Sequence, residues 1–166
     1  MGRLAYVLAL LAIAISAVVI VTTSADLPPM VASHFAAGGR ASGSMARDDY
    51  RLLMLALAVA MPAAIMLSLV ALPRVAPALV SLPNARIWLT PPHRETTLAS
   101  LAARGAIAGI LLTVFICAVH LLVVRANALT PAHLDADALG GVVGAFMLAI
   151  GAWAVALIVR FRKPPT

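Results

Sequence analysis

The sequence predicts an all-α integral membrane protein with four transmembrane helices in an antiparallel bundle. Hydrophobic residues make up 63% of the 166 residues and charged residues only 11%, with a mean hydropathy of +1.05. A water-soluble domain carries about a quarter of its residues as charged side chains, which excludes soluble classes here. The apolar residues also gather in four charge-free runs, at 4–22, 52–72, 105–124 and 138–159.

Each of these runs is long enough to cross a bilayer as a helix. About 20 helical residues span the hydrocarbon core, and a helix satisfies its own backbone hydrogen bonds there. The first run is longer than the core of a signal peptide, so we expect an uncleaved anchor. In the second run, Pro62 lacks a backbone donor and predicts a kink rather than a break. The chain is expected to form one membrane domain, 1–166.

The basic residues between the runs predict the orientation, because lysine and arginine accumulate on the cytoplasmic side of a membrane. With a cytoplasmic N terminus, the inner side would hold Arg3, Arg74, Arg86, Arg94, Arg104, Arg160, Arg162 and Lys163. The outer side would hold only Arg40, Arg47, Arg51 and Arg125. We therefore expect both termini in the cytoplasm, an outer cap loop at 23–51 and an inner connector at 73–104.

Small residues predict how these helices pack. In lipid, helices associate through close approach of their backbones, which glycine permits. Gly105 and Gly109 lie on one face of the third run, and Gly140, Gly144 and Gly151 lie along the fourth. They are the predicted packing positions of a compact bundle. Homodimerisation through one glycine face is equally compatible with the pattern.

The outer segment and the inner connector carry recognisable motifs. Directly after the first run the sequence reads, in order, Leu27-Pro28, Val31, His34-Phe35 and Gly38. This order resembles the outer motif of the SdpI-like bacterial membrane protein family, a domain of unknown function. The connector, with Asn84, Trp88 and Pro91 ahead of a charged helix, is similar to that of a subset of the family. The resemblance implies an immunity or signalling protein and supplies no catalytic residues.

His120 is the polar residue inside a run that most needs an explanation. At about 100° per residue it lies within about 20° of Gly109 and Thr113, so it should point toward the helix seam near the outer interface. Three roles stay open: a structural hydrogen bond, a proton-sensitive switch and a metal ligand. The metal alternative would combine the outer-side residues His34, His120, His133, Asp26, Asp135 and Asp137 around zinc or copper.

Several chemistries are not expected. No carboxylate lies inside a run, which argues against an ion-coupled transporter, and no acid is paired with a base, so we do not expect an enzyme. The pI near 11.1 arises from arginines at segment ends rather than from a clustered stripe, so a nucleic-acid partner is not expected. No cofactor is expected either.

The functional prediction is a non-enzymatic, multi-pass protein of the bacterial inner (cytoplasmic) membrane that recognises a peptide or other ligand at its outer face. The predicted ligand-binding residues are His34, Phe35 and Arg40, with His120 beneath them. Besides the lipid bilayer, the expected partners are a peptide and a membrane protein or second copy. One alternative is an accessory structural subunit of a larger membrane complex, and another is a metal-handling membrane protein. On the inner side we expect Trp88 in the headgroup belt, with Arg94 and Arg104 on anionic lipid.

Overall fold

The computed structural model describes residues 2–76 and 83–162, and most of them are helical. The long helices are α1 (Gly2–Ala25), α2 (Arg47–Val75), α4 (Pro91–Asn127) and α5 (Ala136–Arg162). All four are long and apolar enough to cross a membrane, as the sequence predicts. They extend beyond the apolar runs, and α4 does so most because two prolines in its first turn start it well before Gly105.

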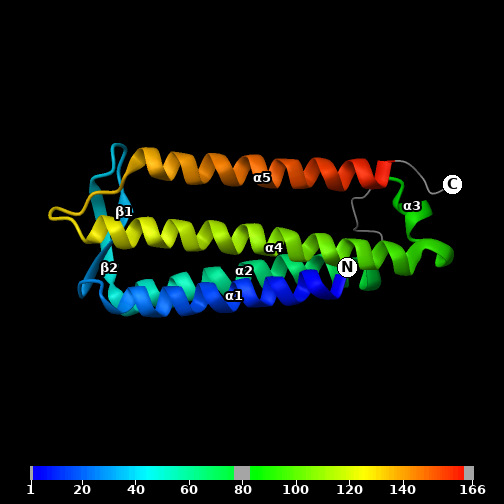
Figure 1. Ribbon diagram of the computed structural model, residues 1–166, viewed down its shortest axis with the longest axis horizontal. Helices are drawn as coiled ribbons and strands as arrows, with labels where there is room; N and C mark the ends of the chain where they lie inside the picture. The colour runs from blue at the N-terminus through cyan, green and yellow to red at the C-terminus, as the bar shows by residue number, and fades with distance from the viewer. Residues whose placement is uncertain (1, 77–82, 163–166) are drawn as a thin grey trace.

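The long helices lie side by side along the longest dimension of the molecule (Figure 1). At one end, strands β1 (Met30–Phe35) and β2 (Ala41–Ala46) form an antiparallel hairpin, which we call the hairpin end. At the other lies the short helix α3 (Ala85–Trp88), and we call this the α3 end. The outer cap loop expected at 23–51 therefore contains a folded two-stranded sheet.

Helix α4 lies at the centre of the helical arrangement and α5 at its edge. In Figure 1, α4 runs between α5 on one side and the pair α1 and α2 on the other. In the most apolar stretch of α4, 44% of residues are buried, whereas the corresponding figure for α5 is 0%. The core is therefore built by α1, α2 and α4, and α5 packs on the far side of α4.

Glycines of α4 allow the close approach of α2. A Cβ added at Gly109 would lie 2.9 Å from the Sδ atom of Met66, and one at Gly105 would lie 3.2 Å from the Cβ of Leu69. Gly109 also faces the carbonyl oxygen of Pro62. Helix α2 continues through Pro62 without interruption. These two glycines thus lie where two backbones are in contact.

The glycines of α5 are in a different position. A Cβ added at Gly140, Gly144 or Gly151 meets no atom within 4 Å, so these residues contact no other element of the described chain. The four-helix bundle expected from the sequence would have buried them. Glycine spacing in the sequence is similar on α4 and α5, but only the α4 glycines face a neighbouring helix.

At the α3 end, side chains donate hydrogen bonds to the last carbonyl groups of α5. The Trp88 indole Nε1–H donates to the Phe161 carbonyl at 2.9 Å, and the Asn84 amide donates to the Arg162 carbonyl at 2.8 Å. Trp88 is only 5% exposed and packs on Phe161 and Leu101, which are fully buried. Trp88 is therefore buried, with partners inside the protein for both its ring and its N–H, and its expected depth at the headgroup belt stays a prediction.

Candidate functional site

The hairpin is fixed to the helices by side chains that bind backbone groups. The Asn127 side chain pairs with Ala32 in both directions: the Ala32 N–H donates to Oδ1 at 2.8 Å, and Nδ2–H donates to the Ala32 carbonyl at 3.0 Å. The amide of Asn127 thus binds β1 as a neighbouring strand would, at the last residue of α4. This contact determines where β1 lies over the bundle.

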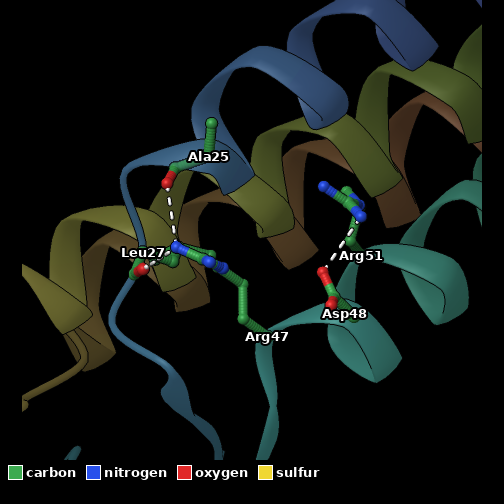
Figure 2. Close-up of polar contacts among 5 residues, drawn as sticks. All are labelled: Ala25, Leu27, Arg47, Asp48 and Arg51. Atoms are coloured by element: carbon green, nitrogen blue, oxygen red, sulfur yellow. Dashed lines mark hydrogen bonds and ion pairs between the residues drawn. The ribbon is translucent and has the colours of Figure 1, made fainter.

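Arg47 makes the second attachment (Figure 2). One guanidinium nitrogen donates to the carbonyls of Ala25 at 3.1 Å and Leu27 at 3.0 Å, where α1 ends and the chain turns toward β1. The last carbonyls of a helix have no intrahelical donor, so a cation there satisfies both a hydrogen bond and the helix dipole. In the same view Arg51 pairs with Asp48 at 2.9 Å. Both arginines are therefore occupied within the chain.

The third attachment joins the hairpin turn to the segment between α4 and α5. The Leu134 N–H donates to the Gly39 carbonyl at 2.8 Å, and Arg40 forms an isolated antiparallel bridge with His133. Gly39 has a φ of 85°, and a Cβ on it would collide with the Leu134 carbonyl oxygen. Only glycine fits this crossing, and it holds Arg40 next to His133.

Beneath the hairpin, three helices meet at His120. This side chain is fully buried, its Nε2 lies 2.7 Å from the Thr23 hydroxyl of α1, and its Nδ1 lies 3.0 Å from the Tyr50 hydroxyl of α2. The Tyr50 and His120 rings stack at 5.7 Å. A polar residue on each helix of the core therefore joins one network.

The protons of this network can be assigned from its bonds. The Thr23 hydroxyl also lies 2.7 Å from the Val19 carbonyl, to which only its O–H can donate. Thr23 then accepts from His120 Nε2–H, which leaves Nδ1 as the acceptor for the Tyr50 O–H. Every hydrogen has an acceptor in this arrangement, so a neutral imidazole satisfies the network fully.

The predicted ligand-binding residues are placed differently from one another. His34 and Arg40 are exposed, whereas Phe35 is half-buried and packs against the core beneath the hairpin. His34 pairs with Gly43 at an irregularity of the strand register, and its imidazole lies 3.1 Å from the Ser33 hydroxyl. His120 is beneath them but is enclosed by its partners. Only His34 and Arg40 can therefore meet a ligand from solvent.

A small cleft with both apolar and charged lining residues opens beside the Arg40–His133 bridge. Its volume is about 180 Å³ and it is lined by Leu122, Arg125, Ala126, Leu129, His133 and Asp135. His133 and Asp135 are exposed, and Asp135 also accepts from the Ala138 N–H at the start of α5. We call His34, Arg40, His133, Asp135 and this cleft the cap surface.

The outer histidines do not form the ligand set of the metal alternative. Among the described residues, which include His34, His120 and His133, no three His, Cys, Asp or Glu side chains lie close enough to hold a metal ion. Both ring nitrogens of His120 are engaged by hydroxyl groups. The expected grouping fails because His120 points into the core rather than toward the hairpin surface.

Sequence reasoning missed Asn127, Arg47 and Tyr50, which carry much of this geometry. Asn127 follows the third apolar run and resembles an ordinary helix-ending residue, while Arg47 and Tyr50 precede the second run and look like interfacial residues. The available signal was that each is a polar residue adjoining a span at the same end as His120. Comparison of the chain with family models, curated proteins and solved structures found no match.

Proposed function

We propose that the chain is a non-enzymatic protein of the bacterial inner membrane that binds a cationic peptide at its cap surface. In this proposal the four helices form an antiparallel transmembrane bundle, the hairpin end faces outward and both termini are cytoplasmic. The distribution of arginines between the two ends supports this orientation. An immunity or signalling role rests on the resemblance of the outer motif.

The observation that carries the proposal is a rigidly attached but exposed cap. Asn127, Arg47 and Gly39 fix the hairpin at three points, while the side chains of His34 and Arg40 remain exposed. A surface held in one conformation loses less entropy when it binds a partner. This is the arrangement expected of a recognition surface rather than of a connecting loop.

Charge at the hairpin end favours a cationic ligand. Asp26, Asp49, Asp135 and Asp137 are exposed there without an ion pair among the described residues. Of the four basic residues at this end, Arg47 is bound to carbonyls and Arg51 to Asp48, while Arg40 and Arg125 are exposed, so the five aspartates exceed the arginines by one charge. Opposite charge raises the rate of encounter and disfavours acidic partners. Exposed Met30 adds an apolar contact for an amphipathic peptide.

A binding experiment tests this function directly. The protein is placed in phosphatidylcholine nanodiscs, and binding of a fluorescent amphipathic Leu/Lys peptide is measured against a Leu/Glu peptide and empty discs. Asp26→Asn with Asp135→Asn should weaken Leu/Lys binding by about tenfold, whereas Glu95→Gln at the α3 end should leave it unchanged. Equal binding of both peptides, or an unchanged affinity of the double variant, would contradict the proposal.

The orientation has its own test. In a Cys117→Ala background, Ser42→Cys in β2 and Ser100→Cys in α4 are each exposed to a membrane-impermeant maleimide on intact cells. Labelling at 42 and not at 100 is expected. The reverse pattern would place the cap surface in the cytoplasm and remove the basis for an external ligand.

A second candidate function is an accessory subunit of a larger membrane complex, and the position of α5 favours it. Gly140, Gly144 and Gly151 present an open glycine face that no described element covers. A partner helix could approach such a face closely. Purification in a mild detergent should then yield a stable complex or a dimer, and a lone monomer would count against this function.

A further inference from the structure

We infer that the groove between α4 and α5 binds one anionic phospholipid, with its phosphate held by Arg104 and Arg160 and an acyl chain along the groove. This inference does not depend on the peptide-binding proposal. It starts from Arg104, whose Nε atom is buried without a hydrogen-bond partner in the described residues. A buried donor without an acceptor is costly, so an acceptor from outside the chain would be stabilising.

Arg160 supplies a second positive charge at the same place. Arg160 follows Trp153 by two helical turns on the same side of α5, and Trp153 contacts the Arg104 carbonyl, so the two arginines lie on facing sides of α4 and α5. The ion pair found among the described residues joins Arg51 and Asp48 at the hairpin end, so no carboxylate neutralises this pair. Two guanidinium groups on facing helices, with no carboxylate paired to either among the described residues, match the charge of a phosphate.

The Arg160 guanidinium is held in position by stacking rather than by hydrogen bonds. Its central carbon lies 4.8 Å from the centre of the Trp88 ring. Stacking on an aromatic face occupies the plane of the guanidinium and leaves the N–H groups at its edge free to donate. Trp88 is itself fixed by its bond to the Phe161 carbonyl, so Arg160 is oriented before a ligand arrives.

The backbones of α4 and α5 are joined at the level of Arg104. The Trp153 indole Nε1–H donates to the Arg104 carbonyl at 3.0 Å. Tryptophan is enriched at the boundary between headgroups and hydrocarbon, and Arg104 directly precedes the charge-free run that begins at Gly105. The arginine pair is thus at the depth of lipid phosphates.

An apolar groove lies between α4 and α5 further toward the hairpin end, and it begins at Leu111, a rise of about 10 Å beyond Arg104. It has a volume of about 350 Å³, and its lining includes Leu111, Phe115 and Ala118 of α4 and Val142, Phe146 and Ala149 of α5. Phe115 and Phe146 stack at 4.4 Å within it. Almost all of its surface is apolar, so an acyl chain fits its chemistry.

The arginines and the groove share one face of each helix. At about 100° per residue, Leu111, Phe115 and Ala118 lie within about 40° of Arg104 around the axis of α4. The same calculation places Ala149 and Arg160 within about 40° of Trp153 around α5. The rise from Arg104 is about 10 Å to Leu111 and about 21 Å to Ala118, so the groove begins within the first leaflet, whose hydrocarbon is about 15 Å thick, and ends past the midplane of the bilayer. This alignment favours a lipid over a free phosphate ion.

The test compares two pairs of arginines. The full-length protein is reconstituted with phosphatidylcholine and a minor fraction of phosphatidylglycerol, and the phosphatidylglycerol that each protein retains in mild detergent is measured by native mass spectrometry. Arg104→Gln with Arg160→Gln should reduce the retained fraction by about tenfold. Arg86→Gln in α3 with Arg162→Gln, which lies about 180° from Trp153 around α5, removes the same charge outside the arginine pair and should change the retained fraction by less than about twofold. An equal loss of retained phosphatidylglycerol in the two double variants would contradict the proposed lipid site.

Two further measurements test the acyl-chain groove and the source of the phosphate separately. Ala149→Leu fills the groove and keeps both arginines, so retention should fall severalfold, and an unchanged retention would overturn the acyl-chain assignment. In phosphatidylcholine discs with inorganic phosphate alone, we expect no bound phosphate by phosphorus NMR. Bound inorganic phosphate without retained phosphatidylglycerol would overturn the lipid assignment. Far-UV circular dichroism and elution volume establish that each variant is folded.

Discussion

At the hairpin end the C-terminus of α1 is closed by Arg47, whereas at the α3 end the C-terminus of α5 is closed by Asn84 and Trp88. Both ends satisfy the carbonyls that a helix leaves without donors. The difference is that a charged donor is used at one end and neutral donors at the other. The two ends also differ in charge: the hairpin end has five of the six acids of the sequence, whereas at the α3 end several arginines accompany Glu95 alone.

The largest effect on the free energy of unfolding is expected from Trp88→Ala at the α3 end. The change removes a buried ring and the donor to the Phe161 carbonyl, and should lower the free energy of unfolding by about 3–5 kcal/mol. Reversible unfolding in mixed micelles, followed by circular dichroism, measures it. Trp88→Phe keeps most of the ring and should cost clearly less. A loss below about 1 kcal/mol for Trp88→Ala would show that this end is not held by packing.

Tyr50→Phe should have the next largest effect, at the hairpin end. It leaves Nδ1 of buried His120 without a donor and should cost about 1–3 kcal/mol in the same unfolding assay. Tyr6→Phe, at a half-buried tyrosine of α1, is the matched control and should stay within about 0.5 kcal/mol. Equal costs for the two variants would remove the special role of the three-helix network.

Asn127→Ala and Asn84→Gly test whether the two ends are held independently. Asn127→Ala should cost about 1–2 kcal/mol and expose the Ala32 amide to hydrogen exchange, with protection at the α3 end unchanged. Asn84→Gly removes the other closing amide but keeps the left-handed backbone conformation at φ 57°. It should lower the protection from hydrogen exchange in the last turn of α5 and leave the protection of the hairpin unchanged. If either variant loses protection from hydrogen exchange at both the hairpin end and the α3 end, the two ends are not held independently.

The smallest effect is expected from Gly144→Leu on the open face of α5. Because a side chain there meets nothing within 4 Å, the free energy of unfolding should change by less than about 0.5 kcal/mol. Gly109→Leu, against Met66 of α2, should by contrast destabilise the protein by about 1–3 kcal/mol. If Gly144→Leu is as damaging as Gly109→Leu, α5 must have a neighbour in the membrane that the single chain does not provide.

The helices were predictable from the sequence because uninterrupted hydrophobicity is a local property. The runs at 4–22 and 138–159 differ from α1 and α5 by only a few residues at each end. The run at 105–124 lies within α4, which begins at Pro91 inside the segment expected as a connector. Composition and run length are sufficient for these features.

The positions of side chains depend on contacts between distant segments, and these were not predictable. Asn127 meets Ala32 across 95 positions of the chain, and Trp88 meets Phe161 across 73. The helical phase of His120 correctly indicates an inward direction, but its Tyr50 partner lies on another helix. Likewise, glycine spacing alone cannot distinguish the contact face of α4 from the open face of α5, because the spacing does not specify a partner.

Helix α4 is a single rod of 37 residues, about 55 Å long, that runs from Pro91 to Asn127. Near its start Thr97 binds the Trp88 carbonyl, and at its last residue Asn127 holds β1. A continuous helix resists bending far more than sliding or tilting. Any load applied to the hairpin is therefore delivered through one stiff element to the aromatic cluster on the opposite side of the molecule, without an intervening joint.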